Sequence, residues 1–185
     1  MANTRQKVAA AVVAVGAMLI APHTVSGAGM PAVTLTPGSH VRSDSPAILA
    51  LIQQATEGSA TFRSLVATID ANDAMVYVQE GRCGHGVRAC FYNVTSSAGH
   101  RLLWVRVDIT KNADWNLMGS IGHELRHTLE VLDQPSVING GAMFCLYQRI
   151  GYHGTRNGME TRAAVDAGQA VREEVRAFNR QTKTE

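Results

Sequence analysis

The spacing of apolar residues changes twice along the chain, and these changes constrain the fold more than any other sequence feature. A three-to-four-residue spacing, typical of amphipathic helices, gives way to alternation in runs rich in β-branched and aromatic residues, and then returns. This order predicts an α+β domain with N-terminal helices, a small antiparallel sheet and a C-terminal helical part. Helices are expected over residues 46–58, 59–69, 114–133, 135–150 and 159–178, and strands over 75–79, 89–94 and 102–109.

The first 28 residues are typical of a signal peptide. Arg5 and Lys7 precede an uncharged run over 8–21, and the small residues Ser26 and Ala28 stand where a cleavage site requires them. The run has 14 residues, fewer than the roughly 20 that span a bilayer, so a permanent anchor helix is the less favoured alternative. We therefore expect export, to the periplasm or the medium, without stable membrane insertion after cleavage.

The rest of the chain divides into a linker and one domain. Residues 29–43 are rich in Pro, Gly, Ser and Thr and predict a flexible tether, and residues 44–185 predict a single domain. The chain has 17 basic and 15 acidic residues, and removal of Arg5 and Lys7 would leave equal numbers. A balanced charge creates no basic field, so binding to nucleic acid is not expected.

Three cysteines follow the signal-like segment. In an oxidising compartment Cys83 and Cys90 are expected to form a disulfide around a short loop. A metal site of Cys83, His85 and Cys90 is an alternative, but its spacing matches no standard zinc knuckle. Cys145 lies in an apolar helical context and is expected to be a buried thiol.

The segment 121–132 contains the pattern His-Glu-x-x-His, formed by His123, Glu124 and His127. On a helix, the apolar residues of this segment share one face, and both histidines lie roughly opposite it. Two imidazoles one turn apart can bind one tetrahedral metal ion, while Glu124 points to the side and can reach a water molecule. A pair of solvated histidines on an exposed face is the alternative.

A catalytic zinc ion needs a third protein ligand. The candidates after His127 are Glu130, Asp133, His153 and Glu160. Glu130 lies about 10 Å along the helix from His123, so we expect it to orient His127 instead. Glu160 is favoured, because it is expected to open a helix whose same face carries a stripe of small residues that allows close helix packing. The stripe consists of Ala164, Ala167, Gly168 and Val171.

His-Glu-x-x-His followed by Glu-x-x-Ala on a separate helix resembles the gluzincin branch of zinc metallopeptidases, in particular short exported bacterial proteins of that type. The resemblance covers residues 121–132 and 158–168. It implies a zincin-like fold, one zinc ion bound by His123, His127 and Glu160, Glu124 as general base, and a sheet edge that holds an extended peptide. Gluzincins often have Asp or Asn four residues after the third ligand, whereas this chain has Ala164.

These observations predict an exported zinc-dependent hydrolase, a metallopeptidase acting on a peptide or protein substrate. Glu124 would take a proton from a zinc-activated water and pass it to the leaving nitrogen. Tyr152, His153 and Arg156 are candidates for stabilising the oxyanion. The alternatives are a non-catalytic zinc-binding or partner-binding module, and an esterase or amidase that uses the same site.

Overall fold

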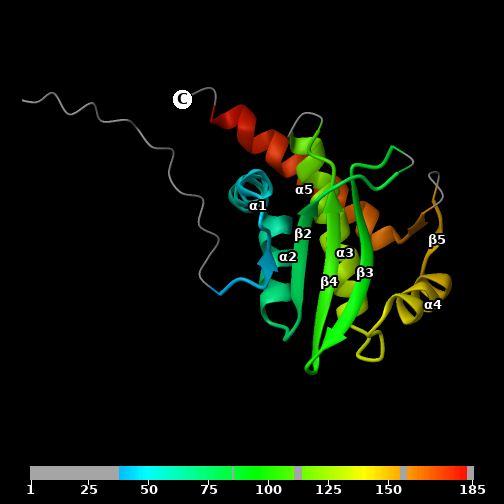
Figure 1. Ribbon diagram of the computed structural model, residues 1–185. Coiled ribbons are helices and arrows are strands. Elements are labelled where there is room, and N and C mark those ends of the chain that lie inside the picture. Colours follow the sequence, from blue (N-terminus) through cyan, green and yellow to red (C-terminus); the bar gives the residue numbers. More distant parts are fainter. Residues whose placement is uncertain (1–37, 85, 111–113, 155–157, 183–185) are drawn as a thin grey trace, which may run out of the picture. The chain divides into compact units, whose positions relative to one another are not determined.

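The computed structural model describes residues 38–84, 86–110, 114–154 and 158–182. This part of the chain is α+β, as expected, with five helices, a four-stranded sheet and a two-stranded sheet (Figure 1). The helices are α1 (Pro46–Gly58), α2 (Ala60–Asp70), α3 (Trp115–Leu132), α4 (Gly140–Ile150) and α5 (Arg162–Gln181). The strands are β1 (Val41–Arg42), β2 (Met75–Glu80), β3 (Ala89–Ser97), β4 (His100–Val107), β5 (Tyr152–His153) and β6 (Met159–Glu160).

The larger sheet is mixed, so the expected antiparallel sheet is wrong. Its order is β1-β2-β4-β3, and β2 pairs with both β1 and β4 in parallel, whereas β3 and β4 are antiparallel. β3 and β4 are joined by a tight turn, in which Ala98 and Gly99 have positive φ angles of 50° and 83°. The longer segment after β2 lets the chain pass over the β4 position, so β3 becomes an edge strand (Figure 1).

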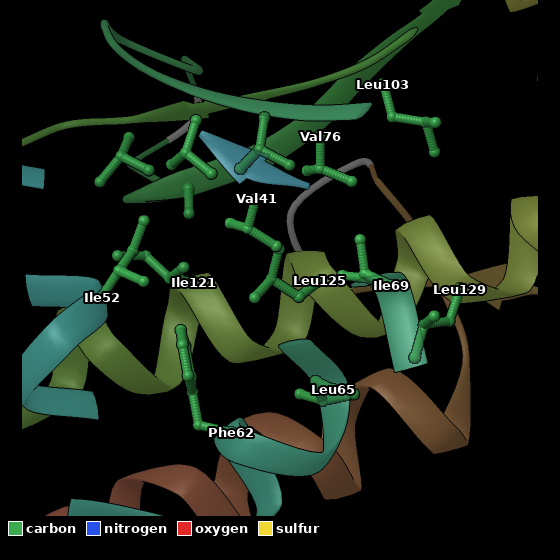
Figure 2. Close-up of a cluster of buried hydrophobic side chains, with 14 of the residues drawn as sticks. Val41, Ile52, Phe62, Leu65, Ile69, Val76, Leu103, Ile121, Leu125 and Leu129 are labelled. Atoms are coloured by element: carbon green, nitrogen blue, oxygen red, sulfur yellow. The ribbon is translucent and has the colours of Figure 1, made fainter. Parts of the chain in front are cut away.

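The core lies between one face of this sheet and the helices. Figure 2 shows Val76 and Leu103 of the sheet directed toward Ile121 and Leu125 of α3, with Phe62 of α2 on the other side of that helix. All five side chains are fully buried. The apolar stripe that the sequence predicts on α3 therefore packs against the sheet and leaves the opposite face of α3 for other contacts.

That other face of α3 packs against α5, the most extensive helix pair in the fold. A Cβ atom added at Gly119 would lie 2.8 Å from the carbonyl oxygen of Gly168, and one added at Gly122 would lie 2.8 Å from a methyl carbon of Val171. The two helices approach closely because glycine backbone meets glycine backbone. The small-residue stripe predicted on the last helix is confirmed as its packing face.

Two helices begin later than the sequence predicts. The helix expected from residue 135 starts at Gly140, because Asn139 caps it by accepting a hydrogen bond from the Ala142 N–H. The last helix starts at Arg162, because the Thr161 hydroxyl accepts from the Ala164 N–H. The expectation that Glu160 opens this helix is therefore wrong, because Glu160 precedes the helix and lies on β6.

The expected tether, residues 29–43, falls partly outside the described residues. Its described end is structured: Val41 is fully buried and pairs with β2. The segments 1–28 and 29–37 lie outside the described residues, so the signal peptide stays a prediction. Among the helices described, none is long and apolar enough to cross a membrane.

Cys83 and Cys90 form the expected disulfide, which closes the segment between β2 and β3. Cys145 is free and exposed, so the expected burial of this thiol is wrong. It follows Phe144 on α4, and both side chains lie on the outer face of that helix, whereas Leu146 and Tyr147 face inward. An apolar neighbourhood in the sequence did not indicate which face of the helix the thiol occupies.

Candidate metal site

Helix α3 presents His123 and His127 on the face opposite its core stripe, as its helical period predicts. Asp114 caps the helix by accepting from the Leu117 N–H, and an uninterrupted helix to Leu132 keeps the two imidazoles one turn apart. Their ring centroids are 4.8 Å apart. His127 is 5% exposed, so the alternative of two solvated histidines does not hold.

Glu160 reaches these histidines from a different element than expected. It lies on β6, where its backbone pairs with Tyr152 of β5. The adjoining residue, Thr161, begins α5, and α5 is packed against α3 through Gly168. The pairing of β5 with β6 and the close packing of α5 on α3 together bring the Glu160 carboxylate over His123 and His127.

The three side chains offer one ligand atom each, and these atoms lie within 4.8 Å of one another. Glu160 Oε2 is 2.9 Å from His123 Nε2 and 3.9 Å from His127 Nε2. The oxygen is buried, yet among the described residues no group makes a well-directed hydrogen bond to it. Two imidazole nitrogens and a carboxylate oxygen that converge in this way fit a metal ion, so the described part of the chain contains a possible metal site.

The electrostatics of the site keep Glu160 ionised. The His123 and His127 imidazoles, with His123 contributing most, outweigh the effect of partial burial and lower the pKa of Glu160 to about 2. The carboxylate is therefore charged at neutral pH. Only an ionised carboxylate binds a metal cation, so this state is the one that the site requires.

Glu130 holds His127 in place. His127 Nδ1 donates to Glu130 Oε2 over 2.8 Å, and the Thr161 hydroxyl donates to the other carboxylate oxygen over 2.5 Å. Burial lowers the pKa of His127, but the contacts with Glu130 and Glu160 outweigh it and raise that pKa to about 9. Because the Nδ1 hydrogen points to Glu130, Nε2 of His127 faces Glu160. The orienting role expected for Glu130 matches this geometry.

Glu124 lies beside the three possible ligands without being one of them. Its Oε2 accepts a hydrogen bond of 2.7 Å from the Phe91 N–H, and its Oε1 is 4.0 Å from His123 Nε2. Burial raises the pKa of Glu124, and the nearby His127 and His123 only partly oppose this effect. One carboxylate oxygen is thus fixed to the sheet edge, while the other faces the possible metal site.

Two hollows meet at this site. The polar hollow, of about 530 Å³, is lined by α3 and α5 and includes Arg88, Asn116, Ser120 and Arg172. The apolar hollow, of about 350 Å³, lies toward α4 and includes Phe91, Met143, Phe144 and Met159. His123, Glu124 and Glu160 line both. The possible metal site is therefore open on two sides, with the edge strand β3 alongside.

The other residues singled out from the sequence lie in various places. Tyr152 lines the polar hollow, and 49% of its surface is exposed. His153 is exposed and lies outside the group of possible ligands. Asp133 caps the end of α3 and is likewise not in that group. Arg156 lies outside the described residues.

Three contributors to the site were not predicted. The Phe91 N–H is free for Glu124 because β3 is an edge strand with a bulge at Phe91 and Asn93. Thr161 has a helix-capping signal, which could have placed the helix start after Glu160. Tyr147 packs its ring on His127 and donates to the His127 carbonyl over 2.9 Å. No local signal marks Phe91 or Tyr147.

Comparison with known proteins found no matching family model, curated protein or solved structure.

Proposed function

We propose that the protein is a zinc-dependent hydrolase that cleaves peptide bonds, with His123, His127 and Glu160 as metal ligands and Glu124 as general base. The observation that carries the proposal is the position of Glu124. It is anchored by the Phe91 N–H, has a raised pKa and directs its other oxygen toward the three converging ligand atoms. A purely structural metal site has no use for a buried, ionisable carboxylate in this place.

The donor set supports zinc, because two imidazoles and one carboxylate are typical of catalytic zinc sites with an open position. The chemistry that zinc supplies in such a site is Lewis acidity, which lowers the pKa of water and polarises a carbonyl group. Glu130 fixes the ring of His127 through Nδ1 and directs Nε2 toward Glu160, and the proton that the raised pKa keeps on Nε2 would be displaced when a metal ion binds. The two hollows supply space on both sides of the ligands.

The chain's own groups then divide the remaining work. Glu124 takes a proton from the attacking water and donates it to the leaving amide nitrogen, and its raised pKa suits both transfers. The edge strand β3 offers backbone groups beside α3 that support an extended peptide. Tyr152 lines the polar hollow and stays the candidate for donating to the oxyanion.

The test compares zinc content and peptide hydrolysis in three variants. Glu124→Gln should retain about one equivalent of zinc and lose at least about 100-fold in hydrolysis, because the ligands are intact and the base is absent. Glu160→Ala should lose zinc affinity and therefore melt at a lower temperature in the presence of zinc. Glu57→Gln, an exposed position on α1, is the matched control and should resemble the parent.

The outcomes separate an enzyme from a scaffold. If the parent binds zinc and hydrolyses no peptide in a diverse set, the alternative of a non-catalytic zinc-binding module is favoured. If esters are cleaved but peptides are not, the same site serves an esterase. If Glu160→Ala binds zinc as the parent does, the assignment of Glu160 as the third ligand is wrong.

A further inference from the structure

The polar hollow contains a cation, Arg172, that has no acidic partner among the described residues. Arg172 lies on α5 and lines this hollow together with His123 and Glu160. Its Nη1 donates to the neutral amide oxygen of Gln169, and its buried Nε meets no hydrogen-bond acceptor among the described residues. No carboxylate of the described chain forms an ion pair with it. An arginine placed in this way favours an acidic ligand.

The other charged groups of the hollow do not compensate Arg172. Glu124 accepts from the Phe91 N–H, and Glu160 lies against His123. Arg88, the second cation in the lining, is paired with Asp114 at 3.3 Å. Because Glu160 and Glu124 serve the possible metal site, a ligand that enters the hollow meets Arg172 as its principal uncompensated charge.

The stem of Arg172 is held in a fixed place beside the site. Its Cβ lies 3.0 Å from the position of a Cβ built on Gly119, and Gly119 is one turn before His123 on α3. One turn of helix is about 5.4 Å, and an extended peptide advances about 3.3 Å per residue. A carboxylate bound by Arg172 would therefore lie within a few residues of a bond cleaved at the metal site.

From these observations we infer that the polar hollow selects substrates that carry a carboxylate close to the cleaved bond, with Arg172 as its partner. This inference rests on the proposed hydrolytic function and adds a substrate class to it. The planar guanidinium matches a carboxylate with two parallel hydrogen bonds, which a neutral amide of similar shape does not reproduce. The carboxylate is either an Asp or Glu side chain or the C-terminus of the peptide.

Binding is measured separately from cleavage, by calorimetry on the zinc-loaded Glu124→Gln protein. The probes are leucine- and alanine-based hexapeptides blocked at both ends, with one Asp moved through the six positions, and the same set with Asn. A third set contains Asn and a free C-terminal carboxylate, and it distinguishes the two sources. We expect at least one carboxylate peptide to bind about 10-fold or more tighter than its neutral counterpart.

Two substitutions on α5, in the same background, test the assignment to Arg172. Arg172→Gln should abolish the difference in affinity between carboxylate peptides and their neutral counterparts. Arg172→Lys should keep part of this difference, because lysine has the positive charge but not the paired donors of a planar guanidinium. Arg176→Gln is the matched control: Arg176 is one turn further on, lies over the Trp115 ring and is not among the residues that line the hollow. The Arg176→Gln protein should show the same difference in affinity between carboxylate and neutral peptides as the Glu124→Gln protein.

The inference is overturned if Asp and Asn peptides bind alike, if no peptide binds, or if Arg172→Gln still discriminates. Cleavage of the same peptides by the protein with Glu124 intact is scored independently. Preferential binding of carboxylate peptides without cleavage would support the carboxylate subsite and contradict the hydrolytic function. Cleavage of Asp and Asn peptides at equal rates would support the hydrolytic function and contradict the carboxylate subsite.

Discussion

The crossing of α3 and α5 makes Gly168→Ala an informative perturbation of both fold and site. On an isolated helix this change is favourable by about 1 kcal/mol, because alanine has the higher helix propensity. Here the added Cβ would lie 2.9 Å from the Gly119 carbonyl oxygen and 2.9 Å from the Cβ of His123. Neither neighbour is the free end of a flexible side chain, so the helices must separate.

The magnitude follows from two opposing contributions. Overpacking a tight interior contact costs about 1–3 kcal/mol, and the contact with backbone places this site toward the upper end. After subtraction of the propensity gain, we expect the free energy of unfolding to fall by about 1–2 kcal/mol. For a domain of this size, that corresponds to a melting temperature lower by roughly 3–8 °C.

The assay is thermal unfolding in excess chelator and in excess zinc. The chelator series measures packing alone, and the zinc series should show a larger loss, because displacement of His123 weakens metal binding. Gly141→Ala is the control, since its added Cβ would meet only the Asn139 amide oxygen at 3.4 Å, an ordinary contact. It should leave the melting temperature unchanged or raise it slightly. A Gly168→Ala protein that melts at or above the parent temperature would refute the close-packing argument.

Two further changes test contacts that join distant segments. Thr161→Val removes the cap of α5 and the hydrogen bond to Glu130, so we expect a loss of about 1–2 kcal/mol in urea unfolding and about 10-fold weaker zinc binding; unchanged zinc affinity would contradict the role of Glu130. Glu174→Gln weakens the hydrogen bonds from Ser59 and Thr61 and should cost about 1 kcal/mol at pH 7. Burial alone would raise the pKa of Glu174, but these donors lower it, so the difference from the parent should shrink as pH falls below about 4.5. A pH-independent difference would argue against this explanation.

The local parts of the fold could be predicted because neighbouring residues decide them. Ser45 caps α1 and Asp114 caps α3 through hydrogen bonds that span three residues. The helical period alone places His123 and His127 opposite the core stripe of α3. Cys83 and Cys90 are close enough in the chain for pairing to be expected, and they form the disulfide.

What the sequence left open depends on contacts between segments far apart in the chain. The place of β4 between β2 and β3 is decided by strand pairing across the sheet, and it frees the Phe91 N–H for Glu124. Glu160 reaches the histidines because the pairing of two short strands, β5 and β6, and the Gly119–Gly168 crossing position it. Helix period and capping act over three to four residues, whereas these arrangements exist only once the packed core holds the segments together, and so the tertiary structure decided them.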